Sequence, residues 1–173
     1  MNTRLSRATL FGGLTLGRDY GDLATGDLNN PNLLINEQGA LGYDSPVQVR
    51  GGFSYLLPAE VQVSGSIREA SGLPQSRTYV VTTSIVPGLT QVMQNINAAA
   101  SGDFRYPWQN LIDLRFTKII RMRGGRFEPT VDIFNIFNNN AVTSANTTIG
   151  SALGKPSAIV TGRLVRIGGQ ILF

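Results

Sequence analysis

Alternation of apolar and polar residues in the last third of the chain most constrains its fold. Between Asn110 and Met122 the even positions Ile112, Leu114, Phe116 and Ile120 are apolar, and charged or hydroxyl residues fill most of the odd positions. A period of two residues is typical of a β-strand that has one apolar and one polar face. The segment is therefore predicted to be such a strand.

Two further segments continue the pattern. The turn Arg123-Gly-Gly125 contains glycines, which reach positive φ without steric cost, and Phe127 to Ile133 then alternates again. These features predict a hairpin whose strands share an apolar and a polar face. The last segment, 165–173, follows the same rule and ends on Phe173.

Upstream, the same alternation predicts strands at 5–17, 47–57 and 61–67. Short turns are expected near Pro58 and Gly124, and long connections at 19–44, 73–106 and 139–156, so the two kinds of connection alternate. A strand is expected at 77–83, and the spacing of Val92, Met93 and Ile96 suggests a short helix within 89–100. The fold class is thus all-β: an antiparallel up-and-down meander of about six long strands.

The composition excludes several classes of function. The chain has no cysteine and no histidine, so it lacks thiolate chemistry, the commonest metal ligand and the commonest general base. Its net charge of +4 comes from scattered basic residues, which does not predict a nucleic-acid interface. We expect neither an enzyme nor a bound cofactor or metal.

Two environments could cover the apolar face. In a soluble sandwich, a second sheet would cover it. In the wall of a transmembrane β-barrel, lipid would cover it. Such a wall combines outward apolar residues with short turns on one side and long loops on the other. Charges at strand centres favour the barrel, because they suit a water-filled interior. No run of 18 apolar residues is present, but a barrel strand needs only about 9–11 residues. The predicted lumen-facing residues are Arg50, Arg68, Asp113, Arg115, Glu128 and Asp132.

Side chains on this polar face have a structural and a chemical interpretation. Glu128 and Asp132 lie four positions apart on one strand, too far for a coupled acid pair, so we expect ion pairs with Arg115 and Arg121 or contacts to another domain. Asn135 and Asn138-Asn-Asn140 could bind sugars, but Asn-rich segments more often form turns.

The order of several motifs resembles the C-terminal part of TonB-dependent outer-membrane receptors, and more narrowly the Oar-like receptors that carry a carboxypeptidase-regulatory-like N-terminal module. The motifs are Gly102-Asp-Phe-Arg-Tyr-Pro107, Asn110-Leu-Ile-Asp-Leu-Arg115, Val131-Asp-Ile-Phe-Asn-Ile-Phe-Asn138 and Gly162-Arg-Leu-Val-Arg-Ile-Gly168, followed by the terminal Phe173.

The resemblance implies that residues 1–173 are the C-terminal strands of a receptor barrel in the cell outer membrane, with the plug and the N-terminal module outside them. Such a receptor takes up a bulky nutrient, and its partners would be outer-membrane lipid, the rest of the barrel, the plug and, through the plug, the TonB complex. The resemblance also implies that the barrel-assembly machinery recognises Val165, Ile167, Ile171 and Phe173.

An alternative is a secreted or small-barrel β-protein that binds carbohydrate or protein through its long loops. A third hypothesis is an adhesive surface module that uses the same loops.

Overall fold

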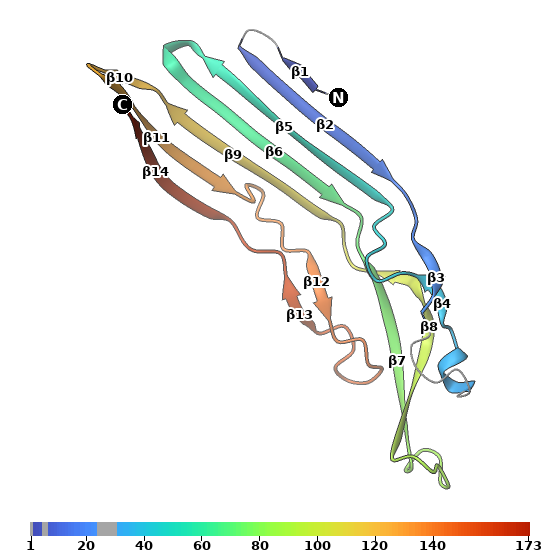
Figure 1. The fold of residues 1–173 in the computed structure, drawn as a ribbon. Helices are drawn as coiled ribbons and strands as arrows, with labels where there is room; N and C mark the ends of the chain where they lie inside the picture. The colour runs from blue at the N-terminus through green and yellow to red at the C-terminus, as the bar shows by residue number, and fades with distance from the viewer. Residues whose placement is uncertain (1, 5–6, 24–30) are drawn as a thin grey trace.

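The structure is a computed structural model that describes residues 2–4, 7–23 and 31–173. Six long strands form an antiparallel meander in chain order, and each is paired with the next (Figure 1). They are β2 (Ala8–Leu16), β5 (Val47–Leu57), β6 (Val61–Ala70), β9 (Gln109–Lys118), β11 (Gly125–Phe134) and β14 (Leu164–Leu172). Two short strands extend this sheet: β1 (Asn2–Arg4) pairs with β2, and β10 (Ile120–Met122) pairs with β11.

Short turns join the long strands at one end of the sheet. The β5–β6 connection is the 3-10 turn η2 (Pro58–Glu60), in which Ala59 and Glu60 have positive φ. The β10–β11 turn contains Gly124 with φ of 92°, a conformation that glycine adopts without strain. Both turns lie where the sequence predicts them.

The long connections form hairpins of their own at the opposite end of the sheet (Figure 1). The first contains β3 (Tyr20–Asp22), η1 (Pro31–Leu34) and β4 (Gln38–Ala40). The second contains β7 (Pro74–Thr82) and β8 (Met93–Arg105), and the third contains β12 (Val142–Ala145) and β13 (Pro156–Ile159). The β7–β8 hairpin reaches furthest from the sheet (Figure 1).

The register places apolar residues together on one face of the sheet, because residues directly opposite on antiparallel strands share a face. Two rows of opposite residues cross all six long strands. One row is Leu10, Phe53, Gly65, Leu114, Ile133 and Val165; the next is Ala8, Tyr55, Val63, Phe116, Val131 and Ile167.

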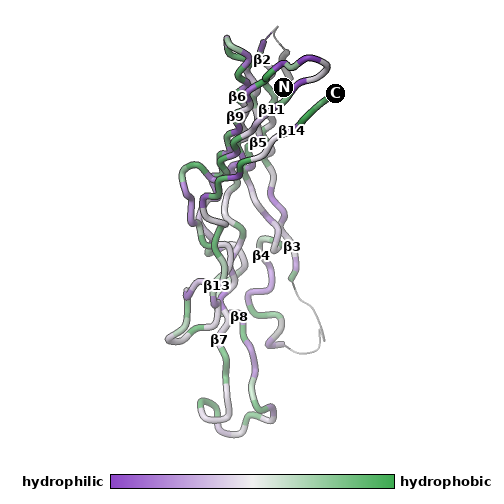
Figure 2. The backbone as a smooth tube through the Cα atoms, turned by 90° about the vertical axis from the view of Figure 1, so that its left-hand side faces the viewer, coloured by the Kyte–Doolittle hydropathy of each residue, from purple (hydrophilic) through white to green (hydrophobic). Residues whose placement is uncertain are grey.

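This apolar face covers no hydrophobic core. Among the described residues the buried apolar side chains are Ala40, Ala141 and Val160, and none of them lies on a long strand. By contrast, Leu14 is 62% exposed and Ile167 82% exposed. Viewed from the side, the long strands form a single layer in which green and purple residues alternate (Figure 2).

The expectation of an all-β antiparallel fold is confirmed. The described strands form an open sheet, since β1 and β2 at one edge and β14 at the other do not pair with each other. The first strand, predicted at 5–17, is observed as Ala8–Leu16, and residues 5–6 lie outside the described residues. No helix within the described ranges is long and apolar enough to cross a membrane.

The helix predicted within 89–100 is wrong. Met93–Arg105 is strand β8, which pairs with β7 from Met93 opposite Thr82 to Arg105 opposite Pro74. Helical spacing of a few apolar residues is weak evidence in a short segment. Here the backbone hydrogen bonds of the hairpin outweigh it.

Candidate functional site: the polar face of the sheet

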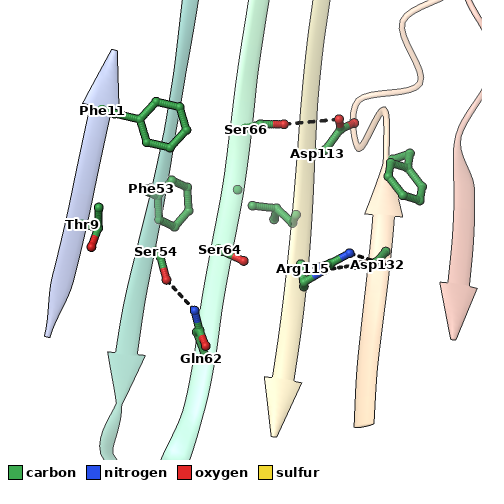
Figure 3. A pocket seen from close by; sticks show the side chains of 13 residues that line it. Thr9, Phe11, Phe53, Ser54, Gln62, Ser64, Ser66, Asp113, Arg115 and Asp132 are labelled. Carbon is green, nitrogen blue, oxygen red and sulfur yellow. Dashed lines mark hydrogen bonds and ion pairs between the residues drawn. The ribbon is translucent and has the colours of Figure 1, made fainter. Parts of the chain in front are cut away.

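A continuous row of polar side chains crosses the centre of the sheet on the face opposite the apolar rows. It runs across six strands as Thr9, Ser54, Ser64, Arg115, Asp132 and Arg166, each directly opposite the next. Residues of this row and its neighbours line a shallow cleft of about 360 Å³ (Figure 3). Within it, Gln62 donates a hydrogen bond to the Ser54 hydroxyl at 2.7 Å.

Asp132 is the most buried charge of this face, with 3% of its surface exposed. Its Oδ1 accepts from Arg115 Nε at 2.5 Å, and its Oδ2 accepts from Arg166 Nε at 2.8 Å. One carboxylate therefore bridges two guanidinium groups from the strands on either side. Arg166 also lies over the ring of Phe134, 5.2 Å from the centroid, in a cation–π contact.

Asp113 connects the sheet to the Asn-rich turn that follows β11. Its Oδ1 accepts from the backbone N–H of Asn135 at 2.8 Å, and its Oδ2 accepts from the Ser66 hydroxyl at 3.3 Å. Asn135 is buried, has φ of 50°, and donates its amide N–H groups to the carbonyls of Asn139 and Thr161. The side chain of Asn135 thus stabilises a turn, in agreement with the turn interpretation.

A second buried charge lies at the end of the sheet from which the hairpins extend. Asp44 is 1% exposed, accepts a hydrogen bond from the backbone N–H of Asp19 at 2.8 Å, and forms an ion pair with Arg105. Arg105 also donates to the carbonyls of Asp44 and Gly72, at 3.0 and 3.2 Å. These bonds connect the segments before β3, before β5, before β7 and at the end of β8.

Opposing effects act on the Asp44 carboxyl. Burial raises its pKa, but the Asp19 N–H and the Arg105 guanidinium outweigh burial and hold the pKa below its usual value. The Asp44 side chain is therefore ionised at neutral pH, and its contacts hold neighbouring segments of the chain together.

The residues predicted to face a lumen all lie on the polar face, although they do not form one cluster. Arg115 and Asp132 bind each other, and Glu128 pairs with Arg126 at 2.8 Å. Arg121 pairs with Glu60 at 2.8 Å, so the expected ion pair between Arg121 and a carboxylate of β11 is wrong. The reason is register, since Arg121 lies directly opposite Arg126.

The remaining two lumen candidates, Arg50 and Arg68, lie directly opposite each other on β5 and β6. Both are exposed. The candidates for an assembly signal lie on the edge strand β14 or just after it, with exposed fractions above one half. They are Val165, Ile167, Ile171 and Phe173.

Sequence reasoning missed Arg166 and the Asp44–Arg105 pair as site residues. The alternation of the last strand could have identified Arg166, because it lies on the polar face with Gln170. No local signal could have joined Asp44 to Arg105, which lie 61 positions apart in the chain.

The chemistry open to this face is binding by charge and hydrogen bonding. Asp132 and Asp113 each use both carboxylate oxygens to accept hydrogen bonds from the protein. Within the described residues no group of three or more His, Cys, Asp or Glu side chains is arranged to hold a metal ion. Comparison with models of protein families, with curated proteins and with solved structures finds no match.

Proposed function

We propose that the chain forms part of the wall of an outer-membrane β-barrel, and that this barrel belongs to a TonB-dependent receptor of the Oar-like kind. The main support is the exposed apolar face of a single-layer sheet. Leu10, Phe116 and Val131 are 55%, 39% and 38% exposed on that face, an arrangement that costs free energy in water and is favourable in lipid.

Strand length supports the same proposal. The six long strands have 9, 11, 10, 10, 10 and 9 residues in chain order. A strand needs about 9–11 residues to cross the hydrocarbon core at a tilt of about 45°. The long strands therefore have the length that a membrane crossing requires.

Unsatisfied edges explain why the rest of a barrel is part of the proposal. Among the described strands, β14 pairs on one side only, with β11, and β1 covers the outer side of β2 only from Thr9 to Phe11. Lipid cannot hydrogen-bond exposed backbone groups at such edges, so strands of the same receptor would close the wall. The hairpins at the long-loop end would then face the cell exterior and take part in capturing a bulky nutrient.

The receptor identity rests on the motif order in the sequence, and the sidedness of the sheet is consistent with it. In this proposal the barrel-assembly machinery recognises Val165, Ile167, Ile171 and Phe173, a plug domain contacts the polar face, and TonB acts through that plug.

A matched pair of cysteine variants tests whether lipid covers the apolar face. The chain has no native cysteine, so Val131→Cys and Thr130→Cys each carry a single label on opposite faces of β11. With an attached fluorophore, we expect strong quenching by bromine-labelled lipid tails at position 131 and little quenching at 130.

Equal quenching at the two positions would contradict a lipid-facing wall. Solubility without detergent, together with gel migration that heating does not change, would favour the secreted β-sandwich that binds carbohydrate or protein. The receptor identity has its own test: the reading frame upstream of Met1 should encode a plug domain and further barrel strands.

A further inference from the structure

Two arginines of like charge lie directly opposite each other on the polar face. Arg50 of β5 is the cross-strand neighbour of Arg68 of β6. Opposite residues of an antiparallel pair have Cβ atoms about 4.5–5.5 Å apart, and like charges at such positions destabilise a sheet. An anion bound between the two guanidinium groups would offset their repulsion.

The described residues supply no carboxylate to either arginine. Arg50 Nη2 donates a hydrogen bond to Gln48 Oε1 at 3.1 Å, and this amide oxygen carries no formal charge. By contrast, the arginines on the same face of strands β9, β10, β11 and β14 each form an ion pair with an aspartate or glutamate, and two of them share Asp132. These are Arg115, Arg121, Arg126 and Arg166.

A cleft of about 470 Å³ opens beside Arg68. Its lining includes Arg68, Asp113 and Arg166, together with residues 160–162, which precede β14. Both oxygens of Asp113 already accept hydrogen bonds from Asn135 and Ser66, and Arg166 is held by Asp132. Of the two arginines that line this cleft, Arg68 is the one that pairs with no carboxylate of the described residues.

We propose that Arg50 and Arg68 bind an anionic oxygen group, a carboxylate or a phosphate, of a small ligand that lies over β5 and β6, next to the cleft that Arg68 lines. A guanidinium presents paired N–H donors that match two oxygens of such a group. An oxyanion between the two arginines would convert their repulsion into two charge-assisted contacts. The proposal stands on the register of β5 and β6 and does not depend on what covers the apolar face.

The test measures thermal unfolding of the full chain in detergent micelles against rising phosphate or tricarballylate. Sodium chloride keeps the ionic strength constant throughout. Both anions should raise the unfolding midpoint saturably, because a ligand that binds only the folded state stabilises it. The anion that saturates at the lower concentration identifies the preferred group.

Variants locate the site. Arg50→Gln and Arg68→Gln should each weaken the apparent affinity about tenfold, whereas Arg121→Gln, whose arginine pairs with Glu60 at the far end of the same face, should not change it. Without added anion at low salt, Arg68→Gln should unfold at the same or a higher temperature than the wild type, because the repulsion is removed.

Two results would overturn the proposal. One is that phosphate and tricarballylate raise the unfolding midpoint no more than chloride does, or raise it equally in the wild type and in all three variants. The other is a lower midpoint for Arg68→Gln without anion, since Arg68 would then be stabilising the sheet by itself. Circular dichroism in the far ultraviolet checks that each variant keeps its strands. The outcome of this test does not depend on the outcome of the lipid-quenching test.

Discussion

A single carboxylate organises the charges at the centre of the polar face. Asp132 is buried between two guanidinium groups whose side chains are 50% and 57% exposed. If Asp132 were absent, Arg115 and Arg166 would lie close together with no counter-ion. The cost of that arrangement is reduced by solvent, which screens both arginines.

Replacing this carboxylate tests its importance. Asp132→Ala should lower the free energy of unfolding by about 1–3 kcal/mol, below the cost of breaking a fully buried ion pair, because both arginines keep half their exposure to solvent. Urea unfolding in detergent micelles measures it.

Glu128→Ala is the matched control on the same strand. Its pair with Arg126 is more open to solvent, because the Glu128 side chain is 18% exposed and the Asp132 side chain 5%, and exposed ion pairs contribute about 0–1 kcal/mol. If Asp132→Ala lowers the free energy of unfolding no more than Glu128→Ala does, the bridge across three strands contributes no more stability than an exposed ion pair.

At the scale of elements, the hairpins are connected to the sheet through buried polar contacts. The Asp44 carboxylate and the Arg105 guanidinium join segments that are distant in the chain, and Gly72 packs so closely that a Cβ there would lie 1.5 Å from the Tyr106 carbonyl oxygen. Side chains larger than glycine do not fit at position 72. The geometry of this junction therefore depends on hydrogen bonds and close backbone packing.

The junction should be sensitive to acid in a defined direction. The pKa of Asp44 is lowered in the folded state from its ordinary value of 3.8. Its contribution to stability is therefore fully present above that value and is lost as the pH falls through the lower folded pKa. Between pH 7 and pH 3 the wild type should lose more stability than Asp44→Asn, as measured by urea midpoints at each pH.

Other carboxyl groups titrate in both proteins, so the difference between the two curves isolates Asp44. Parallel curves over this range would mean that Asp44 titrates alike in the folded and unfolded states.

The whole molecule has two unlike ends as well as two unlike faces. Short turns lie at one end and three hairpins at the other (Figure 1). From Thr78 to Gly102 the chain contains no charged residue, so the outer part of the longest hairpin carries no charge. In the proposed barrel this hairpin lies outside the cell and the short turns lie in the periplasm.

Cysteine labelling on cells tests this orientation. Gln91 is exposed in the connection between β7 and β8. In cells whose outer membrane holds the protein, a membrane-impermeant maleimide should label Gln91→Cys in intact cells. It should label Arg123→Cys, at the β10–β11 turn, only after the cells are opened. The reverse pattern, or equal labelling of both, would contradict the orientation.

The sequence by itself determined the long strands and their faces. Alternation predicted Val47–Leu57 with the observed bounds, and it separated Asp113, Arg115 and Asp132 from the apolar residues beside them. This works because the direction of a side chain in a strand depends only on its position along that strand. The turns at Pro58 and Gly124 were likewise readable, since they depend on local backbone preferences.

Tertiary structure decided which residues meet. The pairing of Arg115 with Asp132, the opposition of Arg50 and Arg68, and the junction of Asp44 with Arg105 all depend on strand register or on contacts between segments far apart in the chain. It also made β8 a strand where local spacing suggested a helix. Register and long-range hydrogen bonds arise only when strands come together, so no pattern within one strand specifies them.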